Sequence, residues 1–472
     1  MSHTVTSWRP STFAQRLDFV ALVAALAIVC RLALLEDVSW LGWVPLAAAA
    51  LVLTATGWPY GALFVLVGTS VMARFYIELL GWKARPEHFA AALVASGMVI
   101  WIAFSRKRPR WNQVDYWIVA YVAINFISSA GSSAPASTLR WALQSSLAVL
   151  PYFLIRILVR DQNTLGKAFN ILLAVGALES AYGILSYVSH QAVGSSFGME
   201  IGQYFVDVAA PYGSMYEPNM FGAYAGCTAV MFLALYLFKN DSRTAYLVGF
   251  LIASLATVLS FSRAALLAFG VSVCWVFWKS RSAARGKSRS MTTIVVAIAM
   301  ILAFSASALG VIRERFSDLY DSGLAEGTTI TRIVAIMEAL REVPSHPFLG
   351  SGTASFNLTF DWASFVPEWA GETTWIGNTP IRVLHDNGLV GLATLVGFGV
   401  TVCWKIRKKL LNGSALVPML LALEAGTLVY CISFQSTDGT VLAFTWVQLG
   451  FLASAAILAD GPMHTVVEQG ET

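Results

Sequence analysis

Apolar segments long enough to form membrane-spanning helices recur along almost the whole 472-residue chain. About twenty apolar residues in a helix cross the hydrocarbon core of a bilayer. Hydrophobic residues make up 57% of the chain and charged residues only 12%, so a soluble core could not bury the apolar surface. The predicted spans are 17–35, 39–56, 60–80, 88–105, 113–130, 140–158, 168–190, 216–238, 244–260, 263–279, 291–312, 388–405, 415–433 and 441–460. We therefore expect an all-α polytopic membrane protein with about 12–14 transmembrane helices and a best count of about 14.

Basic residues in short loops predict the orientation of these spans. Clusters at 106–110, 279–289 and 405–409 all fall on the side of both termini if the chain crosses about 14 times. Because cytoplasmic loops are enriched in Lys and Arg, that side is expected to be cytoplasmic. The charges form short clusters in loops, a pattern that suits topology and gives no support to nucleic-acid binding.

The opposite face, periplasmic in a bacterium, receives the remaining polar features. The largest is the segment 313–387, which divides the chain into N-terminal membrane helices (1–312), a large periplasmic loop (313–387) and C-terminal membrane helices with a short tail (388–472). Helical spacing of apolar residues predicts a helix near 330–340. The aromatic residues between 356 and 375 suit packing on the bundle or an interfacial belt better than stacking on sugar rings.

Two arginines on this face are candidates for binding a diphosphate. Arg263 stands at the outer end of a predicted membrane helix, where a guanidinium is costly unless it is paired or faces water. Arg332 lies on the predicted periplasmic helix. Planar guanidinium groups bind phosphate oxygens in pairs, so two of them would form a clamp. The alternatives are an Arg263 that snorkels to the interface and an Arg332 that is simply solvated.

A carboxylate opens another predicted membrane helix. Glu217 directly precedes Pro218 and Asn219, and proline is normal in the first turn of a helix. Glu217 therefore either complements the helix dipole or acts as a general base at the mouth of the helix.

The end of the long polar segment holds a further group of polar residues. Asn378, Arg382 and His385 are spaced i, i+4, i+7 and share a face if the stretch is helical. His385 is a candidate base near neutral pH, with Asp386 beside it. Asn378 could equally serve as the helix cap, and Asp386 to Gly388 could be only the break before the next span.

Four short motifs, in this order and on this face, resemble the bacterial O-antigen ligase and polymerase superfamily of integral membrane glycosyltransferases. They are the sequences at 213–222, around Ser262-Arg263, from Arg332 through 346–352, and at 384–391. The resemblance covers about 160–460 and implies metal-independent transfer of a glycan from an undecaprenyl-diphosphate carrier, without a cofactor. It implies that Arg263, Arg332 and Arg382 bind the diphosphate. The acceptor proton would go to Glu217, His385 or Asp386, supported by Asn219, Asn378 and Tyr212.

Two departures from the ligase pattern shape the expected activity. The stretch 209–212 lacks the arginine that ligases carry there, and Gly377 stands where they carry a histidine. We therefore favour a polymerase for O-antigen, capsule or exopolysaccharide over transfer to lipid A core. The expected partners are the lipid-linked donor, a glycan acceptor, the bilayer, and a chain-length regulator or other polysaccharide-assembly proteins. A lipid-linked glycan flippase or other transporter and a non-catalytic membrane partner remain as rivals.

Overall fold

The computed structural model describes residues 58–79, 82–105, 109, 111–200, 209–239, 242–283, 327–361, 374–412 and 414–458. Its helices are α3 Tyr60–Ser70, α4 Pro86–Ser105, α5 Gln113–Ala130, α6 Pro135–Leu158, α7 Gln162–Val193, α8 Pro218–Phe238, α9 Arg243–Leu259, α10 Arg263–Ala283, α13 Gly327–Glu342, α14 Phe356–Thr359, α15 Thr379–Leu411, α16 Val417–Ser433 and α17 Ala443–Ile457, with a 3-10 turn η3 at Val343–Ser345. Two short antiparallel hairpins pair β1 Ile77–Leu79 with β2 Trp82–Ala84 and β3 Met199–Glu200 with β4 Ala210–Pro211. The predicted spans 17–35, 39–56 and 291–312 lie outside the described residues.

Helix α8 is the centre of the bundle. Most of its side chains are buried, and the helices packed around it are α7, α9, α10 and α16. Helix α17 lies against α6 and α16, and its Trp446 is among the largest fully buried side chains. A helix that is apolar on all sides and enclosed by other helices suits the interior of a membrane bundle. Five described helices, α4, α6, α7, α8 and α15, are long and apolar enough to cross a membrane.

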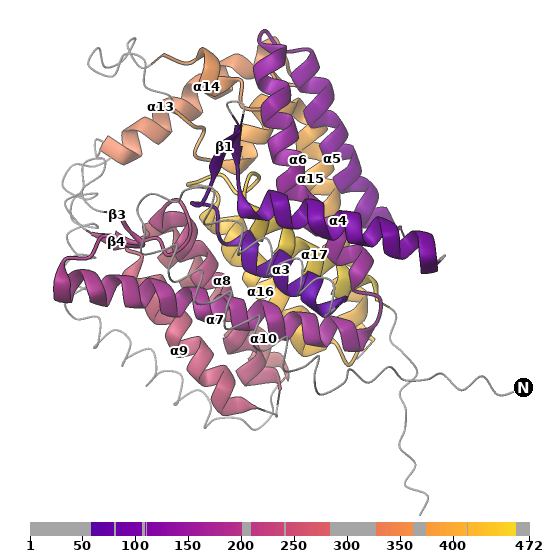
Figure 1. The fold of residues 1–472 in the computed structure, drawn as a ribbon, viewed down its shortest axis with the longest axis vertical. Coiled ribbons are helices and arrows are strands. Elements are labelled where there is room, and N and C mark those ends of the chain that lie inside the picture. Colours follow the sequence, from indigo (N-terminus) through magenta and orange to yellow (C-terminus); the bar gives the residue numbers. More distant parts are fainter. Residues whose placement is uncertain are drawn as a thin grey trace, which may run out of the picture.

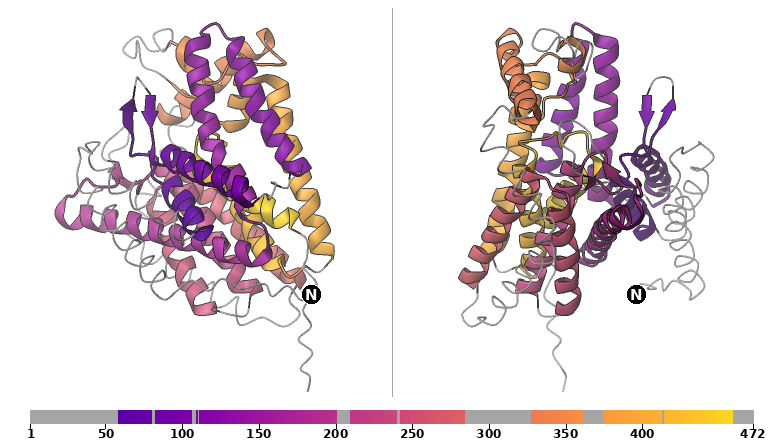
Figure 2. Two further views of the ribbon diagram at one scale, coloured as in Figure 1. Left: turned by 45° about the vertical axis from the view of Figure 1, so that its right-hand side comes forward. Right: turned by 90° about the vertical axis from the view of Figure 1, so that its left-hand side faces the viewer.

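Helices α13 and α14 lie at one end of this bundle. In Figure 1, α5, α6 and α15 run side by side, and the two orange helices α13 and α14 lie near their upper end. Figure 2 shows the same arrangement from two further directions. A small apolar cluster of Ala335, Ala339, Phe356 and Ile376 fixes α13 and α14 to the start of α15. The predicted helix near 330–340 is therefore confirmed, and Phe356 packs on the protein as expected.

The predicted span at 60–80 is wrong beyond Ser70. Helix α3 ends there after 11 residues, too few to cross a bilayer, and the chain then enters the β1–β2 hairpin. The hydroxyls of Thr69 and Ser70 donate to the carbonyls of Val65 and Val67 within the last turn. The following residues include Phe75, Tyr76 and Ile77, which favour extended backbone over helix.

Helix α15 is two helices joined at Gly388. This glycine has φ 66° and ψ −169°, and the helical hydrogen bonds across it are broken. The segment 346–352 satisfies the groups that this break leaves unpaired. Ser351 and Gly352 donate their N–H groups to the carbonyls of His385 and Asp386, at 2.9 and 3.0 Å. Leu389 and Val390, beyond the break, donate to Pro347 and Phe348 at 2.8 and 3.1 Å. The predicted break at Asp386 to Gly388, before the span at 388–405, is therefore confirmed.

Candidate functional site

Glu217 begins α8 but does not cap it. It is the N-cap residue, yet its side chain makes no capping hydrogen bond, and Pro218 occupies the first turn. The side chain is exposed, while residues 211–215 before it are buried and Tyr216 is half-buried. The surrounding protein still displaces enough water to raise the pKa of Glu217 above its ordinary 4.5, and the charge of Arg332 opposes this shift. Glu217 is thus an accessible carboxylate in a partly desolvated setting.

Arg332 comes to this carboxylate from α13. It is half-buried, and its aliphatic carbons lie over Gly377 just ahead of α15. A Cβ atom on Gly377 would be 3.4 Å from Arg332 Cγ and 3.5 Å from the carbonyl oxygen of Ser436. Arg332 therefore lies where α13, the start of α15 and the α16–α17 connection meet. The structure brings together Glu217 and Arg332, two of the residues that the sequence singled out.

Arg263 lies at the same end of the bundle. It is the first residue of α10 and is half-buried. The preceding turn is tight, with Phe261 at φ 51° and the Ser262 hydroxyl accepting from the Ala265 N–H at 3.3 Å. This turn packs on α8 at Gly222, where a Cβ would approach Ser260 Oγ to 2.4 Å. Gly222 follows Glu217 by five residues, about 7.5 Å along a helix, so the turn lies beside the first two turns of α8.

Arg382 is held in a buried ion-pair network. Its side chain is 4% exposed; Nε lies 3.3 Å from Asp386 Oδ2, and Nη1 pairs with Asp438 Oδ2. Asp438 also accepts from the Thr440 N–H at 3.0 Å and the Thr440 hydroxyl at 2.8 Å. The guanidinium lies 5.0 Å from the centre of the Trp375 ring. Nε and Nη1 of Arg382 are therefore already paired with carboxylates.

His385 has both ring nitrogens engaged by carboxylates. Nδ1 lies 2.9 Å from Asp386 Oδ1, and Nε2 lies 2.9 Å from Glu342 Oε2. The ring is 0% exposed and makes an edge contact with Phe356 at 5.5 Å. Because Glu342 ends α13, this contact ties the helix that carries Arg332 to α15. His385 and Asp386 therefore lie together with Arg382 in the interior.

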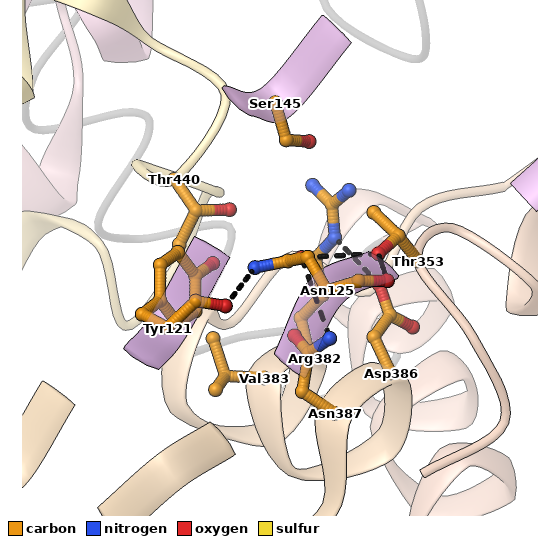
Figure 3. Close-up of a pocket in the computed structure, with 9 residues that line it drawn as sticks. All are labelled: Tyr121, Asn125, Ser145, Thr353, Arg382, Val383, Asp386, Asn387 and Thr440. Carbon is orange, nitrogen blue, oxygen red and sulfur yellow. Dashed lines mark hydrogen bonds and ion pairs between the residues drawn. The ribbon is translucent and has the colours of Figure 1, made fainter. Parts of the chain in front are cut away.

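The polar side chains around this network fill a small cleft (Figure 3). Asn125 accepts from the Thr353 hydroxyl at 3.0 Å and from the Asn387 amide at 3.3 Å. Asp386 Oδ2 accepts from the Ala354 N–H at 2.8 Å. The space left between these groups does not admit a water-sized sphere. The cleft is a hydrogen-bonded polar interior that joins α5, residues 353–354 and α15.

The three supporting residues occupy separate places. Asn378 caps α15, accepting from the Ile381 N–H at 3.0 Å and donating to the Gln435 carbonyl at 3.0 Å. The predicted capping role is confirmed. Asn219 is half-buried in the first turn of α8, close to Glu217 in the chain. Tyr212 is buried, and the Arg74 guanidinium lies 4.2 Å above its ring.

Several residues in or beside these groups were not singled out from the sequence. Glu342 and Asp438 complete the ion-pair network by contacts across more than 40 residues of chain. Arg85 pairs with Glu87 at 2.9 Å, donates to the Val441 carbonyl at 3.2 Å and lies 5.9 Å from the Tyr216 ring. The sequence held a signal for Arg85: the charged cluster Arg85-Pro-Glu87-His88 stands at the start of an apolar helix, as Arg263 does.

Comparison with known families places most of these residues in one domain. No curated protein sequence matches the chain significantly. Residues 248–396 match the family model described as O-antigen ligase. The match includes Arg263, Arg332, Arg382, His385 and Asp386, and it supports an integral membrane protein with a glycan ligase or polymerase activity. The resemblance drawn from the motifs is thus confirmed, and the stretch 248–396 of this chain is similar to the O-antigen ligase family.

Proposed function

We propose that this protein is a glycosyltransferase of the bacterial cytoplasmic membrane. It joins glycan units from an undecaprenyl-diphosphate-linked donor on the periplasmic face, as a polymerase for O-antigen, capsule or exopolysaccharide. The observation that carries the proposal is that Arg332 lies near enough to Glu217, at the start of α8, for its charge to lower the pKa of that carboxyl group. An accessible carboxylate with a raised pKa beside an arginine unites the base and the cation that such a transfer needs.

In the proposed step the carboxylate of Glu217 acts on the acceptor, and the positive charge of Arg332 acts on the leaving group. Glu217 accepts the proton of the acceptor hydroxyl while the hydroxyl oxygen bonds to the anomeric carbon of the donor. The bond from that carbon to the diphosphate oxygen breaks, and its electron pair leaves with the lipid diphosphate. Arg332 and Arg263 stabilise the negative charge of this leaving group. These arginines supply the positive charge, so the scheme needs no metal ion.

Binding of the donor prepares the base. The charge of Arg332 lowers the pKa of Glu217. A diphosphate on Arg332 cancels that influence, so the pKa of Glu217 rises further and the carboxylate becomes a stronger proton acceptor. The same charge contact therefore couples donor binding to acceptor activation.

We assign Arg382, His385 and Asp386 to positioning. Most of their polar atoms are already engaged by one another, by Asp438 and Glu342, and by backbone groups in a buried setting. A buried network in which each member has a partner is rigid and costly to open. Through Glu342 it holds the end of α13, and with it the helix that carries Arg332.

The test uses purified protein in nanodiscs with a lipid-diphosphate-linked oligosaccharide. We expect the wild type to form longer glycans and release lipid diphosphate. Glu217→Gln should lower the rate by about 100-fold or more, the usual effect of losing a general base. Arg332→Ala should also lose most activity. Arg341→Ala is the matched control on the same helix, because Arg341 is 74% exposed and pairs only across the surface with Glu338.

Other outcomes would replace this proposal. Full turnover in both Glu217→Gln and Arg332→Ala would remove the site from the reaction. Translocation of the intact lipid-linked substrate, without bond formation, would indicate a flippase. Transfer to lipid A core but not to a second lipid-linked unit would indicate a ligase.

A further inference from the structure

Glu179 is a buried carboxyl group that the proposed reaction does not use. It lies in the second half of α7 and is 7% exposed. Both of its oxygens face Ser214, three residues before Glu217. Oε1 accepts from the Ser214 N–H at 2.8 Å, and Oε2 lies 2.8 Å from the Ser214 hydroxyl. Glu179 therefore holds the loop that leads into Glu217.

The contact between Glu179 and this loop leaves no spare room. Gly213 has φ 60°, and a Cβ there would lie 2.2 Å from Glu179 Oε1. The loop is also tied to the end of α3, because the Arg74 N–H donates to the Ser214 carbonyl at 3.2 Å. Glycine at 213 thus allows the carboxyl group to lie directly on the backbone.

The hydrogen count around the Ser214 hydroxyl decides the protonation state of Glu179. This hydroxyl lies 2.9 Å from the Val71 carbonyl oxygen and 2.8 Å from Glu179 Oε2. It has one hydrogen to donate, and a carbonyl or a carboxylate can only accept. If Glu179 is ionised, one of these two short contacts brings oxygen atoms together without a hydrogen. If Glu179 carries a proton on Oε2, it donates to Ser214, and Ser214 donates to Val71.

Among the residues that the structure describes, none forms an ion pair with Glu179. The backbone of Arg74 contacts this loop at Ser214, and the Arg74 guanidinium lies over the Tyr212 ring. From α8, the titratable group near Glu179 is Tyr224, whose buried hydroxyl has no hydrogen-bond partner among the described residues. An ionised carboxylate buried without a cation is strongly unfavourable.

We infer that Glu179 is a neutral carboxylic acid that positions the 213–217 loop, and through it Glu217, by donating its proton to Ser214. The catalytic consequence rests on the proposed role of Glu217. The protonation state does not, since it follows from the contacts of Ser214 and from the absence of an ion pair to Glu179 among the described residues.

Glutamine separates this role from that of an ionised or catalytic carboxylate. Its carbonyl can accept from the Ser214 N–H, and its amide can donate to the Ser214 hydroxyl. We therefore expect Glu179→Gln to retain activity within about twofold of the wild type, with an unchanged pH profile. Glu179→Leu, which has neither group, should lose about 100-fold, as expected from a misplaced catalytic group.

Infrared spectroscopy tests the proton directly. The wild type at neutral pH should show the carbonyl band of a buried carboxylic acid, absent in Glu179→Gln and shifted in Ser214→Ala. No such difference band, or inactivity of folded Glu179→Gln, would overturn the inference. Failure of the proposed function would show instead as an active Glu217→Gln, which leaves the infrared band untouched. Should Glu179→Gln not fold, the band in the wild type and its shift in Ser214→Ala decide the question.

Discussion

Arg332 lies over Gly377, with its Cγ 3.4 Å and its Cδ 3.6 Å from the position that a Cβ of residue 377 would take. Gly377, which departs from the expected ligase pattern, is therefore in contact with Arg332, the residue whose charge lowers the pKa of Glu217. The glycine leaves a surface on which the aliphatic part of the arginine rests, so that its charge reaches the carboxylate.

The size of residue 377 should control activity through Arg332. Gly377→Ala places its Cβ at ordinary van der Waals distances, and no positive φ opposes a side chain there, so we expect near wild-type turnover. Gly377→Leu needs the space that Arg332 occupies and should displace it, with a loss of about tenfold or more in glycan formation. Equal turnover of the two variants in the nanodisc assay would show that Arg332 need not lie there.

The pH dependence of turnover should report on the pair of Glu217 and Arg332. Burial raises the pKa of Glu217 and Arg332 lowers it, with burial the larger influence. Because the base must be ionised, activity should fall as the pH falls through this raised pKa, so the acidic limb lies above pH 4.5.

Replacing Arg332 should move the acidic limb of the pH profile in a defined direction. In Arg332→Ala the influence that lowers the pKa is gone, so the acidic limb of the residual kcat/KM, which reports on the protein without bound donor, should shift to higher pH. Arg332→Lys keeps the charge and should leave the limb in place. A shift of the limb to lower pH in Arg332→Ala would show that Arg332 does not lower the pKa of Glu217.

Loss of Asp438 should destabilise the fold far more than loss of a surface acid. Asp438→Ala removes a partner of the buried Arg382 and the acceptor for Thr440. Breaking one side of a buried ion pair costs about 3–5 kcal/mol. Glu338→Ala, which breaks the pair with Arg341, whose side chain is 74% exposed, should cost about 0–1 kcal/mol. Thermal unfolding in detergent compares the two, and equal midpoints would show that the buried pair contributes nothing.

The sequence predicted those features that depend on neighbouring residues. The length and spacing of the apolar segments located most of the described helices. Asn378 and Gly388 were recognisable as a helix cap and a helix break because each acts on the backbone next to it in the chain. The hairpin after Ser70 was missed, since a run of apolar residues there reads equally as helix. Asp438 reaches Arg382 across 56 residues of chain, and such pairings leave no local pattern to detect. For the same reason the sequence did not separate Glu217 from His385 as candidate bases.

The break in α15 should depend on glycine at position 388. A Cβ there would lie 2.3 Å from the carbonyl carbon and oxygen of Phe348, and φ 66° with ψ −169° is a conformation that essentially only glycine adopts. Gly388→Ala must therefore separate 346–352 from α15 or refold the break, and the backbone strain alone costs about 1–3 kcal/mol. Gly399 lies further along the same helix, and a Cβ there would meet open space, so Gly399→Ala should be neutral or slightly stabilising. We expect a clearly lower unfolding temperature for Gly388→Ala alone. If both alanine variants unfold at the wild-type temperature, the interlock of these two segments does not support the fold.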